Sequence, residues 1–334
     1  MYMSLMNLMF FFTLMMGMIL SISAPSWFGA WIGLELNLMS FIPLIMNNKN
    51  QCSSESALKY FLIQALGSSL IIFAASLTLI SYEFSMIMLT TPLLLKLGAA
   101  PFHFWFPQIM EGLSWPQSII LLTIQKIAPM FLLSYLTETQ TTYMILMWAS
   151  IFSALLGSIM GLNQTSLRKL MAFSSINHIG WLLMSLLISD SVFMLYFIFY
   201  YFMSTSVVLL FYFQQAFYMN QMMNQNNLPV NMKVIVFLSL LSLSGLPPFS
   251  GFFPKWVVIQ ELSMNKLYLP LVILIISALI TLYFYLRVSI SFFLLSSPKL
   301  KMSVKYTLSQ SYFTPIFVFF NSLGLILPSI LIFM

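Results

Sequence analysis

Long apolar stretches, separated by short polar segments, run along almost the whole chain. A helix needs about 20 apolar residues to cross the hydrocarbon layer of a membrane, and by that rule the chain carries about eleven candidate spans. We place them roughly at 3–22, 26–47, 56–80, 86–105, 117–136, 143–161, 167–188, 191–214, 232–262, 267–291 and 312–333. The pattern therefore predicts an all-α polytopic membrane protein without a soluble domain.

The fourth and ninth stretches contain related interruptions. Residues 98–107 read G-A-A-P-F-H-F-W-F-P, and residues 245–254 read G-L-P-P-F-S-G-F-F-P. The matching positions are Gly98/Gly245, Pro101/Pro248, Phe102/Phe249, Phe106/Phe253 and Pro107/Pro254. Proline removes a backbone hydrogen bond and clashes with the turn before it. Each copy is therefore expected to break its helix.

The spacing of the two copies predicts an inverted repeat. Because the fourth and ninth spans are five steps apart along the chain, the two broken helices run through the bilayer in opposite directions. We expect residues 1–140 and 141–292 to form two inverted repeats of about five helices each, a transporter architecture with broken helices near the midplane. Residues 293–334 add a loop and a terminal helix.

Basic and acidic residues divide between alternate loops. One side receives Lys49, Lys59, Arg168, Lys169, Lys233, Lys299, Lys301 and Lys305. The other side receives Glu83, Glu138, Asp190 and Glu261, with Lys266 as a basic residue. Such an asymmetry sets the orientation of a membrane protein, and it puts the N-terminus on the basic side and the C-terminus opposite. The net charge of +6 thus follows from the loops and does not indicate binding to nucleic acid.

The composition narrows the function further. The chain is 60% hydrophobic and 6% charged, whereas a soluble domain carries about 25% charged residues. The single cysteine, Cys52, excludes an intrachain disulfide and a cysteine cluster for zinc or iron–sulfur. The sequence has no dinucleotide or phosphate-binding glycine motif and no histidine pair with metal or haem spacing. We therefore expect no cofactor or metal in this chain.

Four ionisable residues fall deep inside predicted spans: Glu35, Lys96, Lys126 and Lys255. A charge near the bilayer centre costs at least about 2.5–3.5 kcal/mol, so such residues indicate function by default. Arg287 lies near the end of its span and is interpreted as an anchor that reaches the interface.

Glu35 and Lys96 could form a switch. An isolated buried lysine tends to lose its proton, whereas a nearby carboxylate favours the charged form. Approach of the two groups would hold the proton on Lys96, and separation would release it. A static ion pair that only fixes helix packing remains the alternative.

The other two lysines are candidate proton carriers. Lys126 lies in Q-K-I-A-P, where Pro129 frees the carbonyl of Gln125 and loosens the helix locally. Lys255 directly follows the second motif. For both lysines the alternative is a side chain that extends to the membrane surface.

Two histidines complete the set of candidates. His178 lies in S-S-I-N-H-I-G-W, with Ser174, Ser175 and Asn177 nearby for a hydrated path, and His103 lies inside the first motif. Histidine titrates in the range needed to pass protons, although a hydrogen-bonded core histidine is the alternative. We favour His178 over His103. The predicted relay along the membrane midplane comprises Glu35, Lys96, Lys126, His178 and Lys255.

Three segments carry a resemblance to a known family. L-L-L-K-L-G-A-A-P-F-H-F-W-F-P, Q-K-I-A-P and S-L-S-G-L-P-P-F-S-G-F-F-P-K-W together resemble the antiporter-like membrane subunits of respiratory complex I. The resemblance covers essentially the whole chain. It implies a proton-translocating subunit in the mitochondrial inner membrane, with the N-terminus in the matrix and the C-terminus in the intermembrane space.

The resemblance also implies roles and partners. Glu35 and Lys96 would be the coupled input pair, Lys126 the central relay and Lys255 the output-side lysine. Flavin, iron–sulfur clusters and ubiquinone would be bound by other subunits. Expected partners are other membrane-arm subunits, including antiporter-like neighbours and small accessory subunits, and lipids such as cardiolipin. A free-standing cation/proton antiporter and an assembly scaffold remain alternatives.

Overall fold

The computed structural model describes residues 5–46, 50–78, 81–223, 230–247 and 249–294 of the chain. Over these residues the regular structure is helical, with one isolated β-bridge between Ser166 and Tyr218. The chain divides into two compact units, Met1–Ser153 and Ala154–Met334, and each is described by itself. The predicted repeat halves remain a prediction.

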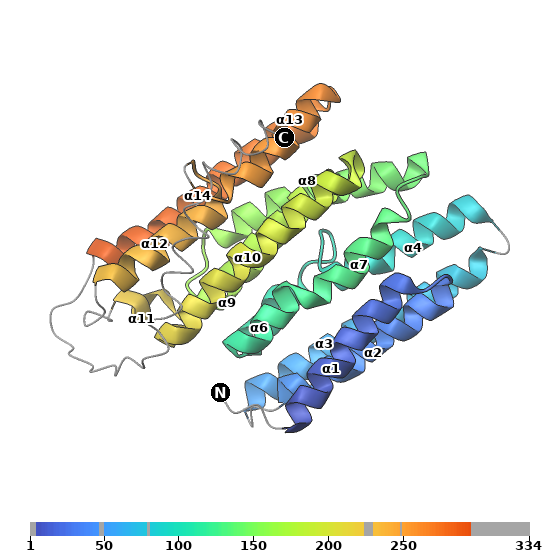
Figure 1. The fold of residues 1–334 in the computed structure, drawn as a ribbon, viewed down its shortest axis with the longest axis horizontal. Coiled ribbons are helices and arrows are strands. Elements are labelled where there is room, and N and C mark those ends of the chain that lie inside the picture. The colour runs from blue at the N-terminus through green and yellow to red at the C-terminus, as the bar shows by residue number, and fades with distance from the viewer. Residues whose placement is uncertain (1–4, 47–49, 79–80, 224–229, 248, 295–334) are drawn as a thin grey trace. The chain divides into compact units, whose positions relative to one another are not determined.

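The first unit is a helical bundle built around α2 and α3 (Figure 1). Helix α2 packs on α1 and α3, α3 packs on α4 and α5, and α7 contacts both α1 and α4. Its helices are α1 (Leu5–Ser23), α2 (Trp27–Met46), α3 (Gln51–Leu77), α4 (Tyr82–Leu97), α5 (Trp105–Gly112), α6 (Trp115–Leu122), α7 (Ile124–Ser134) and the first part of α8 (Gln140–Gly161).

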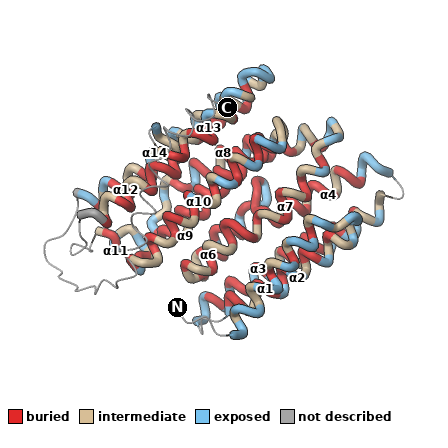
Figure 2. The backbone as a smooth tube through the Cα atoms, viewed as in Figure 1, coloured by how far each residue is buried: buried red, intermediate tan, exposed pale blue. Residues whose placement is uncertain are grey.

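The second unit is organised around α9, which is buried along almost its whole length (Figure 2). Helices α10, α13 and α14 all contact α9, and α12 packs on α10 and α14. Besides the end of α8, the unit holds α9 (Leu167–Ile188), α10 (Asp190–Gln214), α11 (Met219–Met223), α12 (Val230–Ser244), α13 (Phe252–Met264) and α14 (Tyr268–Leu294).

The helices follow the predicted spans closely. Among the described residues, 8 helices are long and apolar enough to cross a membrane, with α6 and α7 taken together as Trp115–Ser134. The pairs α4–α5 and α12–α13 correspond to the two spans predicted to be broken. The final predicted span, 312–333, lies outside the described residues.

The first interruption begins with a tight helix end. Gly98 follows α4 with a φ of 72°, a left-handed conformation that glycine adopts without steric cost. Its N–H donates to the carbonyl of Leu95 at 3.1 Å, and the N–H of Ala99 donates to the carbonyl of Leu94 at 3.1 Å. These two bonds form a Schellman motif, which satisfies carbonyls at the end of a helix.

The second interruption repeats the same backbone geometry. Gly245 follows α12 with a φ of 79°. The N–H of Gly245 donates to Ser242 at 3.1 Å, and the N–H of Leu246 donates to Leu241 at 3.4 Å. The shared glycine of the two sequence motifs therefore marks a shared way of ending a helix.

The prolines of the motifs differ in their effect. Pro107 and Pro254 lie in the first turns of α5 and α13, where a missing N–H costs nothing and the fixed φ suits a helix. The sequence predicts a break at these prolines, but both belong to the helix that starts the second half. Pro101 lies in the connection before α5, and Pro248 is outside the described residues.

Small residues bring α1 unusually close to α2. A Cβ atom on Gly33 would lie 2.7 Å from the carbonyl oxygen of Gly17, and a Cβ atom on Gly17 would lie 2.9 Å from that of Gly33. A Cβ atom on Gly17 would also lie 2.7 Å from Oδ1 of Asn37. The close approach, typical of membrane helices with facing small residues, holds the Asn37 side chain in place on α2.

Candidate functional site

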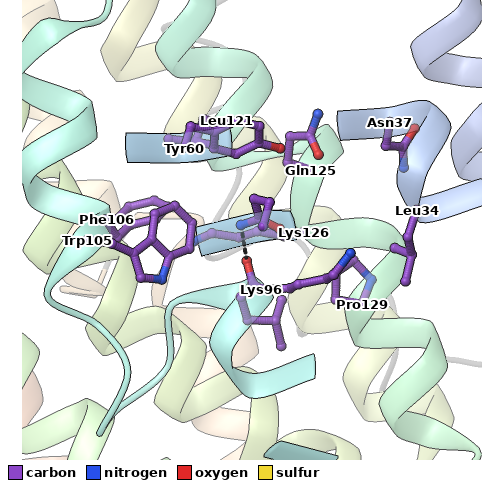
Figure 3. Close-up of a pocket in the computed structure, with 12 residues that line it drawn as sticks. Leu34, Asn37, Tyr60, Lys96, Trp105, Phe106, Leu121, Gln125, Lys126 and Pro129 are labelled. Carbon is purple, nitrogen blue, oxygen red and sulfur yellow. Dashed lines mark hydrogen bonds between the residues drawn. The ribbon is translucent and has the colours of Figure 1, made fainter. Parts of the chain in front are cut away.

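Lys96 lies in the last turn of α4 and is buried. Two neighbouring side chains satisfy carbonyls at this helix end. The amide Nε2 of Gln64 donates to the carbonyl of Lys96 at 3.3 Å (dashed in Figure 3), and the indole N–H of Trp105 donates to Leu95 at 3.0 Å. The aliphatic part of Lys96 lies against Gly67, where a Cβ atom would be 3.1 Å from the lysine Cγ.

Glu35 acts on Lys96 through its charge. The carboxyl group, half-buried on α2, interacts electrostatically with Lys96. Glu35 is not one of the described residues that line the cavity beside Lys96, whereas Asn37 on the same helix is. A neutral amide, Asn37, therefore supplies the polar contact of α2 with the cavity, and the Glu35–Lys96 switch remains a prediction.

Lys126 lies in the first turn of α7 and is only 2% exposed. Its backbone N–H donates to Thr123 at 3.1 Å, at the junction where α6 ends and α7 begins. Its ammonium lies 5.2 Å from the ring centroid of Phe106, a cation–π distance. Burial excludes the alternative in which this lysine extends to the membrane surface.

One cavity joins these two lysines. It has a volume of about 20 Å³ and is lined by Lys96 and Lys126 together with the amides of Asn37, Gln64 and Gln125. Figure 3 shows Lys96, Lys126 and Gln125 around the cavity, with the rings of Trp105 and Phe106 on one side and Asn37 with Leu34 on the other. The structure thus brings together two predicted relay residues, and it adds three amides that were not predicted.

His178 lies in the buried centre of the second unit. Its Nδ1 is 3.0 Å from the hydroxyl oxygen of Tyr196, and its ring centroid is 5.1 Å from that of Tyr200. The hydroxyls of Ser174 and Ser175 donate to carbonyls of their own helix. A tyrosine hydroxyl is therefore the hydrogen-bond partner of His178 that was not expected from the sequence.

Lys255 lies in the first turn of α13 and is 5% exposed. Its Nζ donates to the carbonyl of Ser244, the last residue of α12, at 2.7 Å. The same Nζ lies 5.6 Å from the ring centroid of Trp181, and a Cβ atom on Gly245 would be 2.8 Å from the lysine Cδ. Lys255 therefore spans the second break instead of extending to the membrane surface.

Two aromatic residues connect His178 with Lys255. Trp181 stacks on Tyr196 with ring centroids 6.3 Å apart and an interplanar angle of 8°. Because Tyr196 contacts His178 and Trp181 contacts Lys255, the contacts run from the histidine to the lysine. The sequence carried a weak signal: Trp181 follows His178 by three positions and so shares its helix face.

His103 lies in the connection between α4 and α5. Its ring is buried, 4.2 Å from the ring centroid of Phe104. Neither ring nitrogen has a hydrogen-bond partner among the described residues. His103 does not line the cavity shared by Lys96 and Lys126.

The predicted relay residues fall into two groups. Glu35, Lys96 and Lys126 belong to the first unit, and His178 and Lys255 belong to the second. A single line through all of them remains a prediction. No group of three or more His, Cys, Asp or Glu side chains that could hold a metal occurs within the part of the chain that the structure describes.

Comparison with known proteins identifies relatives over nearly the whole chain. The family described as NADH:quinone oxidoreductase/Mrp antiporter, TM, matches residues 24–281. NADH-ubiquinone oxidoreductase chain 2 of Anopheles gambiae is 48% identical over 97% of each chain. The relative of the same name from Locusta migratoria is 39% identical, over 87% of this chain and 86% of that one. The one from Canis lupus familiaris is 35% identical over 92% of each.

Solved structures share the fold. A chain of respiratory complex I from Thermus thermophilus with bound aureothin superposes with a TM-score of 0.87 and 21% identity, over 98% of this chain and 79% of that one. A chain of the Mrp complex from Dietzia superposes with a TM-score of 0.79 and 15% identity, over 87% of this chain and 61% of that one. The resemblance predicted from the motifs is confirmed. The chain belongs to the NADH-ubiquinone oxidoreductase chain 2 family, within the wider family of NADH:quinone oxidoreductase and Mrp antiporter membrane subunits.

Proposed function

We propose that this chain is a proton-translocating core membrane subunit of respiratory complex I, and that Glu35, Lys96, Lys126, His178 and Lys255 carry the proton. Electron transfer from NADH to ubiquinone takes place in other subunits, which hold the flavin and the iron–sulfur clusters. The observation that carries the proposal is the buried cavity lined by both Lys96 and Lys126 beside a broken helix.

The first unit would take up and transfer the proton. The charge of Glu35 stabilises the ammonium of Lys96, so a change in their separation changes how firmly Lys96 holds its proton. Two ammonium groups in one buried cavity repel each other. Protonation of Lys126 is therefore linked to deprotonation of Lys96, which favours transfer over storage. The ring of Phe106 stabilises the ammonium of Lys126 after transfer.

The second unit would release the proton. His178 exchanges a proton through Tyr196, whose hydroxyl lies at hydrogen-bond distance. Lys255 is the output-side lysine, and its ammonium is stabilised by the carbonyl of Ser244 and by the ring of Trp181. Both neighbours are neutral, so they stabilise the charged form without retaining the proton.

The same proposal includes the membrane in which the chain lies, its orientation and its partners. The chain lies in the mitochondrial inner membrane, with the N-terminus and the basic loops in the matrix and the C-terminus in the intermembrane space. Its partners are other membrane-arm subunits, antiporter-like neighbours and small accessory subunits among them, with cardiolipin among the surrounding lipids. The apolar outer face of α1 is available to such neighbours.

Replacing Lys126 with Met tests the relay. Met keeps the apolar volume but cannot carry a proton, so the assembled complex should translocate fewer protons per electron while NADH oxidation in uncoupled membranes continues. The measurement compares proton translocation per NADH oxidised in wild-type and Lys126→Met vesicles. A full proton-to-electron ratio in the variant would rule out an essential role for Lys126.

The fold shared with the Mrp complex chain favours one alternative, a free-standing cation/proton antiporter. That alternative requires the chain, reconstituted by itself in vesicles, to exchange protons for cations. Our proposal requires it to be inactive alone and to co-purify with flavin and iron–sulfur proteins. The two outcomes exclude each other.

A further inference from the structure

Basic side chains occupy the end of the second unit where α9 and α12 begin and α14 ends: Arg168, Lys169, Lys233 and Arg287. Arg287 on α14 reaches the connection before α9, because its Nη2 donates to the carbonyl of Gln164. Lys233 lies beside the last turns of α14, with its Nζ 5.6 Å from the ring centroid of Phe292. Helix α11 packs on α14 at the same end (Figure 1). These cations therefore belong to one end of one packed unit.

The second unit offers these cations no carboxylate at this end. Between residue 154 and the end of the chain, the acidic residues are Asp190 and Glu261. Asp190 starts α10 after the full length of α9, and Glu261 lies in α13, ahead of the start of α14. At a rise of 1.5 Å per residue, the two acids are about 30 Å away along these helices. That separation exceeds the Debye length of about 8 Å, so the positive charge is not compensated within the unit.

The guanidinium of Arg287 has more donors than its described neighbours accept. A guanidinium carries five N–H donors. The bond from Nη2 to Gln164 is 3.5 Å long, at the limit for a hydrogen bond, and Nε is buried without a hydrogen-bond partner among the described residues. Proteins satisfy nearly all buried polar groups. A further acceptor is therefore expected beside Arg287.

Arg287 also lies beside exposed apolar side chains of α14. Tyr283 and Ile290, four positions before it and three after it, share its face of the helix and are exposed. Leu279 is exposed one turn further from the basic end. Acyl chains can cover this stripe while the guanidinium meets a headgroup at the interface.

We propose that Arg287, supported by Arg168 and Lys233, binds the phosphate of an anionic phospholipid whose acyl chains lie along the exposed stripe of α14. The planar fork of arginine donates two parallel hydrogen bonds to a phosphate, and basic pockets between membrane helices bind anionic headgroups. A zwitterionic headgroup also brings a cation, and this end of the unit has no carboxylate to receive it. The site therefore selects lipids with a net negative charge.

A density map of the complete respiratory complex in native lipid tests the site without any variant. It should contain a phosphate within hydrogen-bond distance of Arg287, continuous with two acyl chains over Tyr283 and Leu279. A carboxylate side chain of another subunit at Arg287, or an empty site in a map that resolves lipids elsewhere in the membrane arm, would overturn the inference.

Photo-crosslinking tests the selectivity of the site. Assembled complex is reconstituted in phosphatidylcholine vesicles that carry either a photoreactive phosphatidylglycerol or a photoreactive phosphatidylcholine, and labelled α14 peptides are quantified by mass spectrometry. Phosphatidylglycerol should label these peptides more strongly, and Arg287→Gln should lower that labelling by about fivefold, as expected for one basic residue at an anionic leaflet. Equal labelling by the two lipids, or unchanged labelling in Arg287→Gln, would refute the site.

Two controls identify the occupant. Lys266→Gln removes an exposed positive charge before the other end of α14 and should leave the labelling unchanged, whereas an equal fall in both variants would show that only net charge matters. Inorganic phosphate in the buffer should not compete, because a soluble anion lacks the acyl chains. Competition by phosphate would overturn the lipid as the ligand. The inference rests on the membrane location of the chain and not on the relay, so the outcome of Lys126→Met does not affect it.

Discussion

The buried lysines have different neighbours. Lys96 ends a helix within reach of the charge of Glu35, Lys126 lies over the ring of Phe106, and Lys255 rests on a backbone carbonyl. A buried ammonium paired tightly with a carboxylate would be a static structural element, costly to separate. The ring of Phe106 beside Lys126 and the carbonyl of Ser244 beside Lys255 are neutral and stabilise an ammonium more weakly, as a residue that must give up its proton requires.

Tyr196→Phe tests the hydroxyl beside His178. The variant keeps the ring that stacks on Trp181 but removes one hydrogen bond, which contributes about 0.5–1.5 kcal/mol. We expect a small loss of thermal stability and a clear loss of proton translocation per NADH. Tyr283→Phe, at an exposed position on α14, controls for the loss of a hydroxyl alone. Equal effects of the two substitutions would contradict a specific role for Tyr196.

Among single residues, the charged ones within apolar stretches are those that the sequence identifies as candidate site residues. The cost of burying an ionised group makes a lysine in an apolar stretch conspicuous, so Lys96, Lys126 and Lys255 could be found from the sequence. Asn37 and Gln125 could not be singled out, because a neutral amide in a membrane helix is compatible with many surroundings. Only the geometry of the cavity distinguishes them.

At the scale of elements, the two broken helices have the same backbone geometry at the break. They differ in the side chains that donate to the free carbonyls there. Both end at a glycine in the left-handed region with the same pair of hydrogen bonds. At the first break, Trp105 and Gln64 supply neutral donors to the free carbonyls. At the second, the amine of Lys255 donates to the carbonyl of Ser244.

Alanine substitutions at Gly98 and Gly245 distinguish the effect of backbone strain from the effect of a contact with Lys255. Gly98→Ala and Gly245→Ala both force alanine into the left-handed region, at a cost of about 1–2 kcal/mol. Only at Gly245 would the new Cβ press on Lys255, at 2.8 Å from its Cδ, whereas at Gly98 it would lie 3.2 Å from Phe106. We expect both to lower the melting temperature of the complex, and Gly245→Ala alone to lower pumping per assembled complex through Lys255. Pumping at the wild-type level in Gly245→Ala would contradict this.

The interruptions were only partly predictable. Glycine and proline in an apolar stretch indicate a break, but the sequence does not tell which residue ends one helix and which starts the next. The α6–α7 junction at Thr123 was missed for a related reason. The sequence predicted a loosened backbone from Pro129, which follows Lys126. In the structure the regular hydrogen bonding is interrupted before Lys126.

At the scale of the whole molecule, the requirements of the membrane allow the spans to be recognised from the sequence. Each crossing must be predominantly apolar and must satisfy its own backbone hydrogen bonds, so apolar length alone indicates most of the helices found. Which helices pack together depends on local fits such as Gly17 against Gly33. Sequence periodicity carries little of that information.

Cys52 offers a test of orientation without substitution. It is the single cysteine of the chain and is exposed near the start of α3, close in sequence to the basic residues Lys49 and Lys59. A membrane-impermeant thiol reagent should modify Cys52 in inverted inner-membrane vesicles and not in right-side-out ones, as read by peptide mass spectrometry. The variant Cys52→Ser/Glu138→Cys should show the opposite pattern. Modification of Cys52 from the intermembrane-space side would reverse the assigned topology.

The repeated helix end at Gly98 and Gly245 has a wider consequence. What recurs in the two halves is a set of main-chain bonds, and these depend on side chains at few positions beyond the glycine. The side chains that cap the two breaks differ: the indole of Trp105 donates at the first, and the amine of Lys255 donates at the second. The two breaks are therefore more alike in their backbone than in their side chains, and a comparison of side chains alone understates that likeness.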